Sequence, residues 1–284
     1  MNLKIANFYV RISGAPFKEF DELFKDYITL DKITNFDFDV EFSVMDKIPM
    51  PSAKLTLPCR KWQHCVNEDG GVCTMRIDDE GPLLRNDISP DGKHAKIAVA
   101  NRKKIYGVDI WYISFFAIGE AFSYAMLKNK CGVLHSSSII LNGSAIAFSA
   151  KSGTGKSTHT SIWQEVYPDA VIVNDDTPVI KFENNIPYLY GSPFAGTSGI
   201  NKNQFAPLKA IVFLHRGKTN KIEKISGAKA ISYFVNEVRK PLVADYLELC
   251  MEFTEKILKT TPVYLLSCTP DKEAVETVMN TVRI

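Results

Sequence analysis

One stretch, Ala145–Thr158, limits the folds open to this chain more than any other; it reads A-I-A-F-S-A-K-S-G-T-G-K-S-T. Its second half is the phosphate-loop pattern, with Ala150 in place of the first glycine. Gly153 and Gly155 let the backbone curl until successive N–H groups point at one anion. A helix that begins near Lys156 would aim the positive end of its dipole at the same place. The stretch therefore predicts a bound phosphate.

The segments on either side of the loop supply the context that this motif needs, a strand before it and a helix after it. Residues 144–149 alternate small or polar with apolar side chains, as a buried strand does. Residues 157–166 lack glycine and proline and predict a helix of about two and a half turns. A glycine- and serine-rich turn that matches by accident is the alternative. We favour a nucleotide site made of Ser152, Gly153, Thr154, Gly155, Lys156, Ser157 and Thr158.

Side chains in and after the loop have separate predicted roles. Lys156 can reach the terminal phosphates, and the Ser157 hydroxyl is placed to ligate Mg²⁺. The next apolar strand, residues 170–173, is followed by N-D-D, which ends in Asp175 and Asp176. This is where a magnesium ligand and a general base are needed, and adjacent carboxylates ionise together only near a cation or a basic group. The alternative is a plain turn, which Asp-Asp-Thr-Pro suits.

Composition excludes several classes of function. The chain has 284 residues, 45% of them hydrophobic, and a net charge of +2, so nucleic acid is not expected as the main partner. Residues 1–14 lack the apolar run and cleavage site of a secretory signal. The six cysteines are scattered, which suits free thiols in a reducing cytoplasm better than a metal site at Cys59, His64, Cys65 and Cys73. The most apolar segment, residues 105–127, carries Glu120 and predicts a buried helix too short to span a membrane.

The rest of the chain divides into two expected parts. Residues 1–104 predict a β-rich, antiparallel region, with strands at 3–12, 36–44, 53–57, 71–77 and 95–99. Residues 105–284 predict the phosphate-loop core. Within it, a strand over 131–141 carries His135, and Asn142-Gly143 predicts a hairpin that returns it into residues 144–149. His135 would then lie beside the loop, although a structural histidine is the alternative.

Later segments supply two further candidate charges. Gly191–Pro207 has no clear periodicity and predicts a lid or substrate loop, with Lys202 as a candidate charge. Arg216 follows a buried strand over 209–214 and is a second candidate for contacting substrate or stabilising charge. We expect residues 221–225 to pair with that strand. Helices are predicted at 228–238 and 243–258, a strand at 262–266, and a last helix over 273–282 capped by Thr269.

These motifs together resemble a known family. The order of the His135 strand, hairpin, phosphate loop, helix, apolar strand and N-D-D is similar to the catalytic core of HPr kinase/phosphorylase, which shares its nucleotide fold with phosphoenolpyruvate carboxykinase. The resemblance covers residues 132–214 and is greatest to HPr-kinase-related bacterial proteins. It implies an α/β fold: a carboxykinase-like phosphate-loop core with a mixed sheet flanked by helices, preceded by the β-rich N-terminal region.

The resemblance also implies a role for each matching residue. Residues 152–157 would wrap the β-phosphate, and Ser157 and Asp176 would hold Mg²⁺. Asp175 would be the base that takes the proton from the attacking hydroxyl, and His135 would hold or tune the acidic pair. The first hundred residues do not resemble the family's N-terminal domain, so neither HPr as substrate nor the reverse reaction is expected.

We therefore expect a cytoplasmic kinase that uses ATP and Mg²⁺ to phosphorylate a Ser or Thr hydroxyl on a peptide or small protein. A kinase of a free small-molecule alcohol, such as an amino acid, sugar or nucleoside, is one alternative. A regulatory module that binds nucleotide without transferring phosphate is another. No nucleic-acid or membrane partner is expected, and the oligomeric state stays open, with a homo-oligomer among the options.

Overall fold

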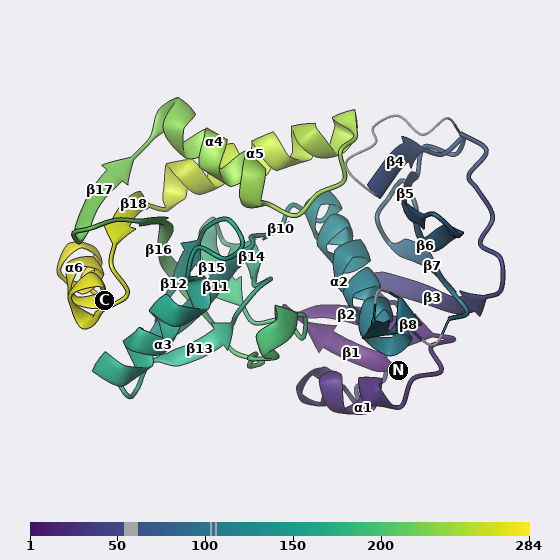
Figure 1. The fold of residues 1–284 in the computed structure, drawn as a ribbon, viewed down its shortest axis with the longest axis horizontal. Helices are drawn as coiled ribbons and strands as arrows, with labels where there is room; N and C mark the ends of the chain where they lie inside the picture. The colour runs from purple at the N-terminus through teal and green to yellow at the C-terminus, as the bar shows by residue number, and fades with distance from the viewer. Residues whose placement is uncertain (54–61, 103, 106) are drawn as a thin grey trace. The chain divides into compact units, whose positions relative to one another are not determined.

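A computed structural model describes residues 1–53, 62–102, 104–105 and 107–284 (Figure 1). They form two compact units, a first of residues 1–129 and 240–249 and a second of residues 130–239 and 250–284. Sheets and helices make the chain a mixed α/β protein. The boundary expected after residue 104 is displaced to residue 129, because helix α2 (Ile110–Lys128) packs on strands of the first unit.

The described residues of the first unit build a seven-stranded sheet in the order β1-β2-β3-β7-β6-β5-β4. Its strands are β1 (Asn2–Ile5), β2 (Phe8–Ser13), β3 (Phe38–Met45), β4 (Trp62–Val66), β5 (Val72–Asp78), β6 (Gly81–Ile88) and β7 (His94–Ala100). The expectation of a wholly antiparallel region is wrong, since β3 pairs parallel with both β2 and β7. A parallel pair needs a crossover, and the one between β2 and β3 contains α1 (Glu19–Leu23) and η1 (Lys25–Tyr27).

Other strand expectations in this unit have mixed outcomes. The single strand expected over 3–12 is the hairpin of β1 and β2, because Ala6 and Asn7 adopt positive φ between them. Most of the strand expected at 53–57 lies outside the described residues. A two-stranded ribbon, β8 (Lys104–Ile105) and β9 (Val108–Asp109), precedes α2.

Helix α2 is apolar because it is buried. By length and composition alone it could cross a membrane, with a mean hydropathy of 1.3, so the expectation that this segment is too short to do so is not met. However, 67% of the 18-residue apolar stretch of this helix is buried within the structure. The Phe122 ring packs 6.3 Å from the Phe38 ring, and Asn86 donates to the Ala117 carbonyl at 3.4 Å. Contact with β3, β6 and β7 accounts for its apolar sequence.

The second unit is built on a mixed sheet, nine-stranded within the described residues, with the path β10-β14-β15-β16-β12-β11-β13. Its strands are β10 (Gly132–Val133), β11 (Ser136–Leu141), β12 (Ser144–Ser149), β13 (Val171–Asn174), β14 (Val179–Glu183), β15 (Ile186–Tyr190), β16 (Phe205–Arg216), β17 (Lys221–Ile225) and β18 (Val263–Cys268). Strand β17 pairs with β18 and not with β16 as expected, because β18 occupies that side of β16.

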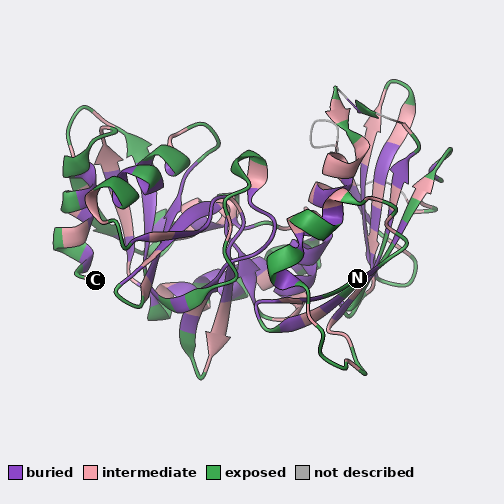
Figure 2. Cartoon of the chain, turned by 90° about the horizontal axis from the view of Figure 1, so that it is seen from below, coloured by how far each residue is buried: buried purple, intermediate pink, exposed green. Residues whose placement is uncertain are grey.

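The helices of the second unit cover this sheet. They are α3 (Lys156–Val166), α4 (Gly227–Glu237) and α6 (Lys272–Val282), together with part of α5 (Ala244–Thr260), whose first residues belong to the first unit. Val212 and Leu214 lie in a core with residues of α3 and α6, whereas Phe213 between them packs 5.4 Å from Phe234 of α4. Strands β11 and β12 are almost wholly buried, whereas β17 is mostly exposed; Figure 2 colours the chain by burial.

The start of α6 differs from expectation. Asp271, not Thr269, caps the helix, and its side chain accepts the Ala274 N–H at 3.1 Å. Thr269 is instead engaged by Asn220, whose amide oxygen accepts both its N–H and its hydroxyl.

Candidate active site

The candidate residues gather at one edge of the second unit's sheet. Strands β12, β16 and β18 run parallel, and β13 runs the same way because both it and β12 pair antiparallel with β11. Their carboxyl ends therefore share an edge. The phosphate loop leaves β12 there, Asp175 follows β13, and His135 directly precedes β11. The Asn142-Gly143 hairpin joins β11 to β12 as expected.

The phosphate loop has the turn that its glycines predict. Gly153 has a φ of 78° and Gly155 a φ of 119°, in the left-handed region that side chains other than glycine rarely adopt. A Cβ at either position would meet nothing within 4 Å, so the backbone conformation, and not crowding, calls for glycine. Helix α3 begins at Lys156, and the flanking Ser152, Ser157 and Thr158 are exposed. The loop is thus open to a ligand.

Lys156 turns inward and is only 8% exposed. Its Nζ lies 3.0 Å from the Ala150 carbonyl oxygen and 3.0 Å from His135 Nε2. Burial lowers the pKa of Lys156, an effect that the carboxylates of Asp176 and Glu237 partly oppose. The ammonium group is therefore poorly solvated and would gain from a nearby phosphate.

His135 links this lysine to two carboxylates. Its Nδ1 lies 2.8 Å from Glu237 Oε2, and its Nε2 lies 3.3 Å from Asp176 Oδ1. With the Nδ1 proton donated to Glu237, the neutral ring has a lone pair on Nε2 that accepts from Lys156. Nε2 cannot accept from Lys156 and donate to Asp176 at once, so it forms a hydrogen bond with only one of them at a time.

The acidic pair is held by a tight turn. The Asn174 side-chain oxygen accepts the N–H groups of Asp176 at 2.9 Å and Thr177 at 2.6 Å. Asp176 also lies 3.5 Å from the Arg239 guanidinium. Asp175 is only 7% exposed, and its Oδ1 is buried without a hydrogen-bond partner among the described residues. An orphaned buried carboxylate oxygen is costly unless a proton or a cation reaches it.

These residues fit a magnesium ion of the kind that nucleotides bring. Within the described part of the chain, no cluster of three or more His, Cys, Asp or Glu side chains could hold a metal by itself. Mg²⁺ typically takes one or two protein carboxylates, with waters and substrate phosphates as its other ligands. Asp176 and the exposed Ser157 hydroxyl match that limited set.

Cys65 and Cys73 face each other across β4 and β5 as buried free thiols, and Cys59 lies outside the described residues.

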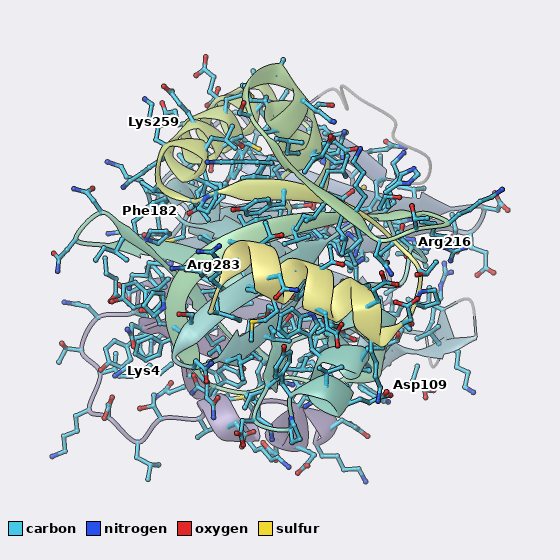
Figure 3. The ribbon with its side chains drawn as sticks, turned by 90° about the vertical axis from the view of Figure 1, so that its left-hand side faces the viewer. Lys4, Asp109, Phe182, Arg216, Lys259 and Arg283 are labelled. Carbon is cyan, nitrogen blue, oxygen red and sulfur yellow. The ribbon has the colours of Figure 1, made fainter. Side chains whose placement is uncertain are left out.

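The two other candidate charges lie in different places. Arg216 donates from Nε to the Thr154 carbonyl at 3.2 Å and from Nη2 to the Gly153 carbonyl at 2.5 Å, so it contacts the phosphate loop itself (labelled in Figure 3). Lys202 is exposed, and its backbone N–H donates to Val173 at 2.8 Å. No described side-chain contact links Lys202 to the cluster around Lys156.

The loop after β15 is anchored and not free. Asp175 N–H donates to Ile200 at 3.2 Å, and Gly191 N–H donates to Gln204 at 2.9 Å. Phe205, Ala206 and Pro207, which we expected in the loop, belong to β16.

Glu237 and Arg239 are members of the site that sequence reasoning missed. They reach it because residues 237–239 pair with residues 133–135: His135 N–H donates to the Glu237 carbonyl, and Arg239 N–H to the Val133 carbonyl, both at 2.9 Å. Burial alone would raise the pKa of Glu237, but the hydrogen bond from His135 and the charges of Lys156 and Arg239 outweigh it and lower that pKa. One local feature of the sequence could have drawn attention to Glu237: it is the last residue of helix α4, at the negative end of the helix dipole, where a carboxylate is disfavoured.

Comparisons with known proteins add little. No family model matches the chain, and no curated protein matches it. Among solved structures, the HPr(Ser) kinase/phosphatase from Coxiella burnetii aligns over 53% of this chain and 95% of its own, with 11% identity and a TM-score of 0.34. A likeness of this size assigns neither fold nor function, so the function is inferred from the residues of the site.

Proposed function

We propose that the chain is a kinase that uses ATP and Mg²⁺ to phosphorylate a Ser or Thr hydroxyl of a peptide or small protein. Its second unit would be a phosphate-loop core of the HPr-kinase and carboxykinase type. One observation supports this most: at the mouth of the loop, His135 Nε2 lies within 3.0 Å of Lys156 Nζ and 3.3 Å of Asp176 Oδ1, with Asp175 adjacent. A triphosphate grip and an acidic pair are the two parts that phosphoryl transfer needs together.

Phosphate binding would use groups that are already positioned. The glycine-rich turn and the first turn of α3 present backbone N–H groups, and the helix dipole favours an anion there. Lys156 would exchange its contacts with Ala150 and His135 for a phosphate oxygen. Released from Lys156, His135 Nε2 would donate to Asp176 once it takes up a proton, while Nδ1 stays bound to Glu237.

The transfer step would need one base. Asp175 accepts the proton of the acceptor hydroxyl, whose oxygen forms a bond to the terminal phosphorus while the bond from that phosphorus to the bridging oxygen breaks and ADP leaves. Asp176 and Ser157 would hold the magnesium ion, which neutralises charge on the phosphates when bound. The orphaned Oδ1 of Asp175 suits a base, since no described group already occupies it.

Two variants and a control test this proposal. Lys156→Ala should weaken ATP binding by about 10-fold or more, because it removes a charged hydrogen-bond donor. Asp175→Asn should keep ATP binding and lose transfer by about 100-fold or more, as expected for a general base. Lys151→Ala, which removes an exposed lysine of the same loop, should change neither. Calorimetry and ADP release measure the two effects.

The same experiment separates the alternatives. ATP binding without turnover on any acceptor, with Asp175→Asn indistinguishable from the unaltered chain, would replace the kinase by a nucleotide-binding regulatory module. ADP release stimulated by a free amino acid, sugar or nucleoside, and not by cellular peptides or proteins, would assign a small-molecule acceptor. Full transfer by Asp175→Asn would remove Asp175 as the base.

A further inference from the structure

Two clefts flank the phosphate loop in the second unit, with Arg216 in the wall of both. The first, the β18 cleft, has a volume of about 430 Å³ and is lined by Thr158, His159, Leu214, Arg216, Cys268 and Pro270, among others. The second, the α4 cleft, has a volume of about 530 Å³ and is lined by Lys151, Phe213, Arg216, Tyr233, Asn236 and Glu237, among others. Both are in the size range of small-molecule sites.

We propose that the β18 cleft is the subsite for the nucleoside, with its purine base and ribose, of the nucleotide whose phosphates the loop binds. This inference rests on the proposed function. It adds the binding site for the part of the ligand that neither the loop nor the acidic pair contacts.

The order of the strands supports this direction of binding. Strands β11 and β13 lie on one side of β12, from which the loop leaves. His135 directly precedes β11, and Asp175 and Asp176 directly follow β13. Strands β16 and β18 lie to the other side, and the β18 cleft is at their carboxyl ends. A triphosphate whose terminal phosphate faces Asp175 therefore extends its nucleoside end toward β16 and β18. Because the cleft includes Gly155 and Thr158, it is continuous with the phosphate loop.

The lining of the β18 cleft suits an uncharged aromatic base better than that of the α4 cleft. His159 is 3% exposed and accepts the Trp163 indole N–H at Nε2, and burial lowers its pKa to about 4, so at neutral pH its ring is uncharged. Leu214 and Pro270 add apolar surface. The described residues that line this cleft include no carboxylate, whereas the α4 cleft contains Glu237, which is committed to His135.

Arg216 gains a specific role from this arrangement. It donates to the carbonyl oxygens of Gly153 and Thr154. Both peptide bonds are trans, so the N–H groups in the same peptide units, those of Thr154 and Gly155, point away from Arg216. Arg216 therefore braces the loop from the side of its carbonyl groups. Its planar guanidinium also lines the cleft, where a purine can stack on it.

Filling each cleft in turn tests the inference. Cys268→Phe fills the β18 cleft from the end of β18, and Ser232→Phe, the matched control, adds the same ring at an exposed position of the α4 cleft. Dissociation constants are measured by calorimetry for Mg-ATP and for magnesium tripolyphosphate, which has the phosphates without a nucleoside. We expect Cys268→Phe to weaken ATP at least 10-fold and tripolyphosphate less than 2-fold, while Ser232→Phe changes neither. The same loss of ATP affinity in Ser232→Phe but not in Cys268→Phe would overturn the assignment.

A measurement on the unaltered chain guards against misfolding of the variant. Cys268 is partly exposed, while the other described cysteines are buried, so N-ethylmaleimide and peptide mapping can follow its alkylation. ATP should slow that alkylation at least 5-fold and tripolyphosphate should not. Equal rates with saturating ATP would overturn the nucleoside subsite and leave the phosphate site intact. Failure of both ATP and tripolyphosphate to bind would instead overturn the proposed function, and the subsite with it.

Discussion

Single side chains at this site depend on partners that are distant in the sequence. His135 lies between Lys156, Asp176 and Glu237, the last of them 102 positions away. The Glu237 carboxylate fixes the ring through Nδ1 and so decides what Nε2 can do. Glu237 is thus a positioning residue, which we expect to affect transfer more than nucleotide binding.

Replacing Glu237 by Gln tests this positioning. The change keeps the side chain's size but removes the charge that strengthens its hydrogen bond to His135, so we expect kcat to fall about 10-fold. The dissociation constant for ATP should stay within about 3-fold, because the loop's own donors are untouched. Glu255→Gln, on an exposed glutamate that pairs with Lys259, serves as control. An unchanged kcat in Glu237→Gln would remove the positioning role.

His159 predicts how stability depends on pH. Burial lowers its pKa from 6.5 to about 4, so between these values the unfolded chain binds a proton that the folded chain does not. Its contribution to stability is therefore complete above pH 6.5 and is lost as the pH falls toward 4, by at most about 3 kcal/mol. Urea unfolding at several pH values should show a smaller acid loss in His159→Gln. Equal losses in both chains would show that other groups control this range.

Among the elements, the loop between β15 and β16 is fixed by close backbone approach. A Cβ on Gly191 would lie 1.9 Å from the Lys202 carbonyl oxygen, closer than any side chain allows. Glycine is required at position 191 because there is no room for a side chain; its φ is not positive. At Gly153 and Gly155 in the phosphate loop the reason is different, because their φ is positive. The approach brings the segment around Lys202 against the end of β13, next to the acidic pair.

Gly191→Ala should therefore destabilise the fold by about 1–3 kcal/mol, because backbone atoms must move to admit the methyl group. Since the same segment holds Asp175 through Ile200, phosphoryl transfer should fall as well. Thr197→Ala, an exposed change in the same loop, should stay within about 0.5 kcal/mol. Urea unfolding measures both, and a neutral Gly191→Ala would show that the segment moves away without cost.

For the whole chain, the two units do not follow the sequence in simple succession. Residues 240–249 belong with 1–129, so the chain leaves the second unit and returns to it. Helix α2 belongs to the first unit because Phe122 and Ala117 contact its sheet. A fragment that begins at residue 105 would carry that apolar helix without its strands.

We thus expect a fragment of residues 105–284 to aggregate more than one of residues 130–284, because it exposes α2. Size-exclusion chromatography and circular dichroism of both fragments, with the full chain as control, measure this. If the 105–284 fragment stays monomeric and folded while the shorter one aggregates, α2 belongs functionally to the second unit.

The sequence predicted those features of fold and site that local chemistry decides. The glycine turn of the phosphate loop, the Asn142-Gly143 hairpin and the strand that leads into Asp175 depend on neighbouring residues, and each formed where expected. Alternation of apolar residues located β3 and β7, but it is the same in parallel and antiparallel strands and so could not reveal their parallel pairing.

Other features were decided only when distant segments met. Glu237 and Arg239 come to His135 and Asp176 through the pairing of residues 237–239 with 133–135, which no local pattern encodes. Arg216 could be recognised as a charge, but not as the partner of the loop's carbonyls. The residues able to bind an anion were readable in order along the chain. Their electrostatic environment, which depends on burial and on contacts across the sheet edge, was set by the tertiary structure.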